Sequence, residues 1–236
     1  MPRYNDGLLR GKSSMLLDDT QRAFIGFEQR ALRDKYLSYL DAANSEAQMQ
    51  YFLEANPILI PGLYDLHNGP VGNVVVSKLQ LANEFVTDFA FISANSAVAQ
   101  VTLIEIESPV TTLFRDSDSE FTASFNKSFQ QVRDWKLWTE QHATFLKDTF
   151  RALYHKNIFR HQKVTTRCIL VTGRRAEVQS SPKHEKRWAS VNHNASTIVM
   201  TYDRLGDIFA FNARLLQNLS CVTSQEVASS MSTSID

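Results

Sequence analysis

Two glutamates lie two positions apart near the end of a β-rich apolar run. Residues 101–110 read VTLIEIESPV, so Glu105 and Glu107 come just before a Ser-Pro stop. Side chains alternate along a strand, and the two carboxylates therefore point to the same side of it. Like charges roughly 6–7 Å apart beside apolar neighbours repel each other and resist desolvation. We expect a compensating group, and a divalent cation is the first candidate.

A third acid, Asp88, lies in the apolar stretch FVTDFAFI, seventeen residues before Glu105. The sequence SANS joins the two stretches and predicts a β-hairpin, in which Asp88 and Glu105 meet if the turn register aligns them. These two carboxylates and the carbonyl oxygen of Ile106 would then offer three hard oxygen donors to Mg²⁺ or Mn²⁺. The alternative interpretation is that the acids are satisfied or exposed residues at a sheet edge.

The elements that must position these acids follow the order helix, three strands, helix, two strands, helix. This order predicts an α/β sandwich, a mixed sheet with helices on both sides. Helices are predicted over residues 18–43, 45–56, 121–154 and 204–219, the third with a break near Gln141. Strands are predicted over residues 74–81, 85–92, 98–107, 166–173 and 196–203.

Composition narrows the class of protein. The chain has 236 residues, of which 43% are hydrophobic, and its formal net charge is zero. No run approaches eighteen consecutive apolar residues, and the start has no apolar stretch of signal-peptide length, so we expect no membrane association. The two cysteines, Cys168 and Cys221, lack metal-ligand spacing. We therefore expect a cytoplasmic protein with reduced cysteines and no zinc.

Positive charge is concentrated in one segment. Residues 151–187 contain ten Lys or Arg against two acids. Such asymmetry favours a surface that faces a polyanion, and the alternatives are a solvated basic face or one used in oligomer contacts. No base-reading motif is visible, so we expect contact with a nucleic-acid backbone and little sequence specificity. The candidate residues for this contact are Arg174, Arg175, Lys183, Lys186 and Arg187.

Three stretches, taken in order, resemble the Shedu family of antiphage nucleases. They are EAQMQYFLEANPILI, the Asp88 and Glu105 core followed by Ser-Pro, and SFQQVRDWKLW. The core also resembles the D…(D/E)-x-K motif of the restriction-endonuclease-like, PD-(D/E)XK superfamily. The likeness covers roughly residues 45–210 and implies a restriction-endonuclease-like sandwich, with a central mixed sheet flanked by helices.

The same resemblance divides the chain into parts. It implies a nuclease domain over residues 45–219, preceded by an arm and helix over residues 1–44 that serve assembly or regulation. Residues 220–236 are rich in Ser and Thr, and this composition predicts a disordered tail.

The resemblance also implies roles for individual residues. Asp88 and Glu105 match the family's metal-binding acids, whereas Glu107 stands where the family usually has a lysine. Glu107 cannot supply positive charge, but it could act as a general base or bind a second metal ion. Gln131 and Trp135 resemble a Gln-x3-Tyr motif whose glutamine lies beside the metal site. The alternative is that Gln131 is an exposed helix residue and Trp135 a core residue.

Three further residues are candidates for supporting roles. Lys127 lies one helical turn before Gln131 and could provide the positive charge that is missing at Glu107. Glu46 and Gln50 match the family's first-helix positions, and Glu46 could extend the acidic cluster. Glu46 could equally serve the dipole of its helix N-terminus alone.

The resemblance implies a metal-dependent DNA endonuclease that uses Mg²⁺ or Mn²⁺ in bacterial defence against phage or plasmids. Its substrate would be double-stranded DNA, and a homo-oligomer is implied, with a tetramer as the expected state. The first alternative is a catalytically inactive nuclease fold that acts as a DNA-binding or protein-interaction module. The second is a purely structural oligomeric protein whose acids are surface residues.

Overall fold

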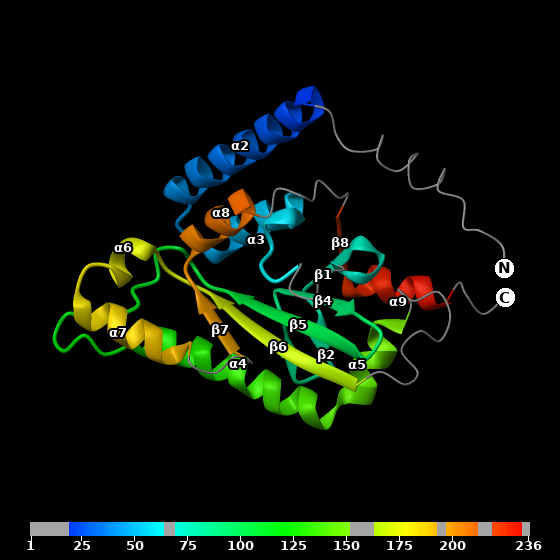
Figure 1. The fold of residues 1–236 in the computed structure, drawn as a ribbon. Coiled ribbons are helices and arrows are strands. Elements are labelled where there is room, and N and C mark those ends of the chain that lie inside the picture. The colour runs from blue at the N-terminus through cyan, green and yellow to red at the C-terminus, as the bar shows by residue number, and fades with distance from the viewer. Residues whose placement is uncertain (1–18, 64–68, 152–162, 193–196, 212–218, 233–236) are drawn as a thin grey trace, which may run out of the picture.

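The centre of the molecule is a mixed six-stranded sheet that carries helices on both faces (Figure 1). The computed structural model describes residues 19–63, 69–151, 163–192, 197–211 and 219–232. The strands of the central sheet are β1 (Val74–Ser77), β4 (Phe89–Ala94), β5 (Val98–Ile106), β6 (Lys163–Val171), β7 (Thr197–Met200) and β8 (Ser220–Thr223). Two shorter strands, β2 (Gln80–Leu81) and β3 (Phe85–Val86), pair with each other.

The sheet order is β7-β6-β5-β4-β1-β8. Strands β5, β6 and β7 are parallel, while β4 runs antiparallel to both β5 and β1, and β8 is parallel to β1. This arrangement confirms the prediction of an α/β fold with a mixed sheet between helices.

Helices cover the sheet on both sides. Those over residues 19–42, 46–55, 123–149 and 202–211 overlap the four predicted helices, whereas the helices over 175–178, 182–191 and 224–232 were not predicted. Those on the first part of the chain are α2 (Asp19–Ala42), α3 (Glu46–Ala55), η1 (Pro57–Leu59) and η2 (Val71–Asn73). Those on the rest are α4 (Ala123–Gln141), α5 (Ala143–Thr149), α6 (Arg175–Val178), α7 (Pro182–Val191), α8 (Tyr202–Phe211) and α9 (Ser224–Ser232). The predicted break near Gln141 is confirmed, because α4 ends there and α5 begins two residues later.

Strand β5 shows how one sequence serves two hydrophobic cores. Leu103 packs in the core shared with α4, whereas Ile104 and Ile106 pack in the core shared with α2, α3 and α8. Because side chains alternate, Glu105 and Glu107 lie on the α4 face, in line with Leu103. The two glutamates therefore point the same way, as the sequence predicts.

The predicted strand over residues 85–92 is interrupted. Strand β3 ends at Val86 and β4 begins at Phe89, so Thr87 and Asp88 lie at a break between two sheets. The Asp88 N–H still donates to the Ile104 carbonyl at 3.1 Å, which continues the ladder to β5 by one residue. Asp88 is thus at a strand end, where its side chain can reach neighbouring backbone.

The helix before residue 45 is not separate from the domain. Tyr36 and Leu40 of α2 are almost completely buried, in the same core as Met49 of α3 and Leu205 of α8. The C-terminal half of α2 thus buries its apolar face in the same core as the sheet domain, and the predicted boundary after residue 44 stays a prediction. The arm over residues 1–18 lies outside the described residues.

The expectation of a disordered tail is wrong for residues 220–232. Strand β8 pairs with the free edge of β1, from Val74 opposite Ser220 to Ser77 opposite Thr223. The short run alternates, since Cys221 packs toward one core and Val222 toward the other. The prediction of disorder rested on the high Ser and Thr content of this segment, which makes the alternation of Cys221 and Val222 difficult to recognise. The predicted helix over residues 204–219 lies partly outside the described residues, because its last part falls in 212–218.

Over the described residues, the structure contains no helix with the length and apolar character needed to cross a membrane.

Candidate active site

The hairpin of β4 and β5 brings the first two acids together. Phe89 is opposite Ile104, and one further step along this register sets Asp88 opposite Glu105. Both side chains are buried, with 4% and 9% of each residue exposed. The expected meeting of Asp88 and Glu105 across the ladder therefore occurs, at the end of the antiparallel pair.

The Asp88 carboxylate has a backbone partner and a side-chain partner. Its Oδ2 accepts the Ile106 N–H at 2.7 Å, and its Oδ1 accepts a hydrogen bond from the Lys78 ammonium. The Asp88 carbonyl in turn accepts the Lys78 N–H at 2.9 Å and contacts Gln50 Nε2 at 3.4 Å. Backbone and side chain of Asp88 are thus held from β5, α3 and the turn after β1.

Glu105 faces helix α4. Its Oε1 accepts a hydrogen bond from Gln131 Nε2 at 2.8 Å. Burial raises the pKa of Glu105 far above its ordinary range, and the negative charge of Asp88 raises that pKa further, with smaller contributions from Glu107 and Glu46. Without a bound cation, Glu105 therefore carries a proton at neutral pH.

Glu107 is half-buried just beyond the end of β5. Its Oε1 accepts a hydrogen bond from Ser128 on α4, one turn before Gln131. Its backbone is held on both sides, because its N–H donates to the Val171 carbonyl at 2.9 Å and its carbonyl accepts from the Tyr202 hydroxyl. The main chain at Glu107 is therefore anchored to β6 and to α8.

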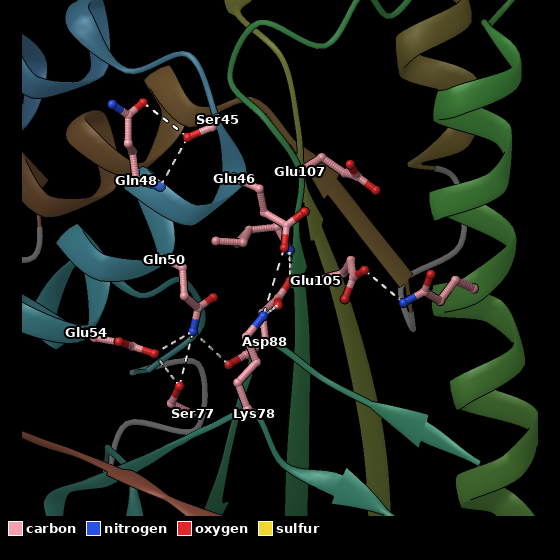
Figure 2. Close-up of polar contacts among 12 residues, drawn as sticks. Ser45, Glu46, Gln48, Gln50, Glu54, Ser77, Lys78, Asp88, Glu105 and Glu107 are labelled. Carbon is pink, nitrogen blue, oxygen red and sulfur yellow. Dashed lines mark hydrogen bonds and ion pairs between the residues drawn. The ribbon is translucent and has the colours of Figure 1, made fainter.

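Helix α3 adds a fourth acid at the rim of the site. Ser45 caps the helix by accepting the Gln48 N–H, which sets Glu46 in the first turn. Glu46 Oε1 lies 3.9 Å from Lys78 Nζ, and Figure 2 shows Lys78 reaching both Glu46 and Asp88. Burial raises the pKa of Glu46, and the charge of Asp88 adds to this effect.

Gln50 lies one turn after Glu46 and carries an unsatisfied acceptor. Its Nε2 donates to Glu54 Oε1 at 2.7 Å and to Ser77 Oγ at 3.1 Å. Its Oε1 is buried and has no hydrogen-bond partner among the described residues. Figure 2 shows this amide on the side of α3 that faces Asp88. This buried acceptor is therefore free to contact a ligand.

This donor set suits a hard divalent cation. Asp88 and Glu105 supply carboxylate oxygens, and the unsatisfied Gln50 Oε1 supplies an amide oxygen, all ligands that Mg²⁺ and Mn²⁺ accept. Within the ranges that the structure describes, no three His, Cys, Asp or Glu side chains are already gathered as a metal site. The residues therefore fit the cation by donor type, with Lys78 Nζ bonded to one of the donors.

The other predicted site residues lie in different surroundings. Ile106 is fully buried and its N–H contacts Asp88, while the expected role of its carbonyl stays a prediction. Trp135 is a buried core residue on the inner face of α4, which agrees with the alternative interpretation of that residue. Lys127 is exposed on α4. Among the described residues, the ammonium group that contacts Asp88 and Glu46 belongs to Lys78, which no sequence motif indicates.

The candidate DNA-binding residues fall into two groups. Arg174 bridges Asp41 of α2 and Asp203 of α8, at 2.8 and 3.2 Å. Arg175 pairs with Asp207 and Arg187 with Glu120. By contrast, Lys183 and Lys186 are exposed on α7 and make no ion pair with another described residue. Three of the five are therefore engaged within the fold, and two remain available to a polyanion.

Sequence reasoning missed Lys78, Ser128 and Tyr202. Lys78 and Asp88 lie ten residues apart in stretches that both read as strands, so a cross-strand contact was a visible possibility. Ser128 lies in the same helix as Gln131 at a spacing of three residues, which sets both on one helical face. Tyr202 had no local signal, because its partner Glu107 is 95 residues away in the chain.

A family model, described as the C-terminal region of the Shedu protein SduA, matches residues 43–205. This match covers well over half of the 236 residues and confirms the resemblance read from the motifs. Among curated proteins, none matches the chain.

Proposed function

The chain belongs to the Shedu protein SduA C-terminal family, and from this premise we propose that it is a metal-dependent DNA endonuclease. The Shedu family is associated with antiphage defence. We assign to this chain a restriction-endonuclease-like fold and the hydrolysis of phosphodiester bonds in phage or plasmid DNA, with little sequence specificity.

One observation carries the proposal. Asp88 and Glu105 are buried opposite each other at the end of an antiparallel pair, and a helix amide holds Glu105 in place. Burying two adjacent carboxyl groups is unfavourable, and in this site the Lys78 ammonium beside Asp88 and the raised pKa of Glu105 only partly offset that cost. A protein whose acids served only solubility would leave them exposed. The arrangement is therefore better explained by a site that binds a cation and works on a charged substrate.

The residues that would hold Mg²⁺ or Mn²⁺ are Asp88 and Glu105, with Gln50 Oε1 and the Ile106 carbonyl as further donors. A bound cation at this place would make a water molecule more acidic and would neutralise charge on a phosphate. Gln131 orients Glu105 through its 2.8 Å hydrogen bond, and the Ile106 N–H orients Asp88. Both acids are thereby held by groups on two different elements.

Glu107 is the candidate general base. Ser128 donates to its Oε1, which leaves Oε2 to take a proton from the attacking water. The Tyr202 hydroxyl and the Val171 carbonyl hold its backbone at the end of β5, so that its side chain starts from a fixed point. In this geometry the Glu107 carboxylate can accept a proton from the attacking water, whereas a lysine at this position would also bring positive charge.

Lys183 and Lys186 on α7 supply the surface that we propose for the DNA backbone. Helix α7 is tied to the segment before α4 by the Arg187–Glu120 ion pair and by stacking of His184 on Phe114. It therefore has a fixed position next to the helix that carries Gln131 and Ser128. A homo-oligomer, with a tetramer as the expected state, would bring several such surfaces onto one DNA.

The test is cleavage of supercoiled and linear plasmid DNA with Mg²⁺, Mn²⁺ or EDTA. We expect metal-dependent cleavage by the wild type and a loss of at least about 100-fold in Asp88→Asn, because a carboxylate donor is removed. Asp116→Asn, an exposed change in the loop before α4, should cut like wild type. Equal cleavage by Asp88→Asn and wild type would contradict the assignment of the site.

A second candidate is a catalytically inactive nuclease fold that binds DNA or a protein. It is favoured by Glu107, which stands where the family usually has a lysine. Metal binding separates the two functions, because the enzyme must bind Mg²⁺ or Mn²⁺ and the inactive module need not. Calorimetric titration of Mn²⁺ into the wild type and Asp88→Asn measures this directly.

A further inference from the structure

We propose that Lys78, in the turn after β1, supplies the positive charge that Glu107 cannot provide at the motif's lysine position. This inference rests on the proposed nuclease function and names a further residue of that site. The juxtaposition of Lys78 with Asp88 and Glu46 carries it, since Asp88 lies just before β4, Glu46 lies on α3 and Lys78 follows β1.

The position of the ammonium suits contact with a substrate phosphate. Lys78 Nζ bonds to Asp88 Oδ1 and lies 3.9 Å from Glu46 Oε1. The Asp88 side chain is 6% exposed, whereas that of Lys78 is 48% exposed. The ammonium therefore stands between the buried acids and solvent, where a phosphate group entering the site would meet it.

The backbone of Lys78 supports a specific role for its side chain. Its φ is 52°, a left-handed conformation that residues other than Gly, Asn and Asp seldom adopt. The turn is held at both ends of the residue, because the Lys78 N–H donates to Asp88 O at 2.9 Å and its carbonyl accepts from Ser224 Oγ at 2.7 Å. A glycine would suit this backbone better, so the lysine side chain offsets an unfavourable conformation.

The chemistry assigns Lys78 an electrostatic task and Glu107 the proton transfer. The oxygen of water forms a bond to phosphorus while the bond from phosphorus to the leaving ester oxygen breaks. One proton of the water passes to the Glu107 carboxylate, and the leaving oxygen takes a proton from solvent. Lys78 keeps its protons and stabilises the negative charge that builds on the phosphate oxygens. The two tasks of a single motif lysine are thereby divided between two residues.

The decisive variants are Lys78→Met, which removes the charge and keeps the aliphatic chain, and Lys78→Gly, which also relieves the left-handed backbone. We expect both to cut plasmid DNA about 100-fold more slowly than wild type. Lys163→Met is the matched control, since Lys163 is exposed at the opposite end of the sheet and should leave cleavage unchanged. Lys127→Met tests the rival cation on α4.

Two further measurements separate an electrostatic role from a structural one. Mn²⁺ should bind Lys78→Met at least as tightly as wild type in calorimetry, because a cation that competes for Asp88 has gone. Adding Glu107→Lys to Lys78→Met should restore cleavage at least tenfold, because the lysine returns to its motif position.

The outcomes decide between the proposals. If the wild type cleaves DNA and both Lys78→Met and Lys78→Gly cleave it equally fast, the role of Lys78 is overturned and the nuclease proposal stands. The same conclusion follows if only Lys127→Met loses cleavage. The role of Lys78 is also overturned if Lys78→Gly loses Mn²⁺ binding together with cleavage. It is overturned as well if the double variant Lys78→Met, Glu107→Lys cleaves as slowly as Lys78→Met. A wild type that cuts no DNA with either metal overturns the nuclease proposal itself, and the role of Lys78 with it.

Discussion

Each acid of the site is stabilised by a different kind of neighbour. Asp88 lies beside the Lys78 ammonium and the Ile106 N–H, whereas burial and the charge of Asp88 raise the pKa of Glu105. Glu107 is half-exposed and accepts from a hydroxyl. Because the environment decides which carboxyl group is ionised, residues of the same type can have different roles in one site.

Glu105 makes stability depend on pH. Its pKa is raised in the folded protein, so the folded state keeps a proton that the unfolded chain releases above about pH 4.5. The free energy of unfolding contributed by this group is therefore fully present below that pH and falls as pH rises through neutrality. We expect Glu105→Gln, measured without metal, to be more stable than wild type at pH 8.5 by at least about 1.4 kcal/mol, the equivalent of one pKa unit.

Thermal unfolding at pH 4.5 and pH 8.5 measures this difference. The gain of Glu105→Gln over wild type should be larger at the higher pH, whereas Glu185→Gln, an exposed change on α7, should show no such trend. The same difference in melting temperature at both pH values would show that Glu105 is not held neutral by the fold.

At the scale of elements, the site depends on helix α2 and helix α8. The Tyr36 hydroxyl of α2 donates to the Tyr202 carbonyl at 2.7 Å, and the Tyr202 hydroxyl donates to the Glu107 carbonyl. Arg174 adds an ion-pair bridge between Asp41 of α2 and Asp203 of α8. The end of β5 is therefore connected through α8 to a helix that the family match leaves out.

Truncating the packed face of α2 should destabilise the whole domain. Leu40 is 1% exposed in the core beside α3 and α8, so Leu40→Ala is expected to lower the free energy of unfolding by about 2–5 kcal/mol. Leu137→Ala, at a residue that is 58% exposed on α4, should change it by less than about 0.5 kcal/mol. Chemical denaturation measures both, and an unchanged stability of Leu40→Ala would mean that α2 is an appendage.

At the scale of the whole molecule, the candidate DNA-binding residues fall into a paired group and an exposed group. Arg174, Arg175 and Arg187 hold helices together through Asp203, Asp207 and Glu120, and neutralised charges of this kind are poorly placed to bind phosphates. Lys183 and Lys186 stay exposed on α7. A count of basic residues along the sequence therefore overstates the charge that the folded surface offers to DNA.

The double variant Lys183→Gln, Lys186→Gln should weaken DNA binding and leave folding intact. The slope of log affinity against log salt is negative, and each lost phosphate contact makes it less steep by about 0.9. For two lost contacts we expect the slope to become less steep by roughly 2. Fluorescence anisotropy at several salt concentrations measures the slope. Arg174→Gln should instead lower the melting temperature. An unchanged slope in the lysine variant would exclude α7 as the DNA surface.

The sequence by itself determined much of this protein. Alternation along residues 98–107 set Glu105 and Glu107 on one face, because that property is local to a strand. The helical repeat set Gln131 and Lys127 on one face of their helix for the same reason, and the family resemblance implied that Gln131 lies beside the acids. The three motif stretches identified the family before any fold was known, since short motifs survive in linear order. Strand and helix positions followed from periodicity over most of the described chain.

Only the tertiary structure decided which groups complete the site. Lys78 reaches Asp88 because β1 pairs with β4 in one register and because the strand is interrupted at Thr87 and Asp88. Both features depend on contacts between segments that are separate in the sequence. Tyr202 reaches Glu107 across 95 positions of sequence. The tail formed β8 because β1 left an edge unpaired, which depends on every other strand of the sheet. Contacts between distant segments follow from the packing of two whole cores, and no short window of sequence contains that information.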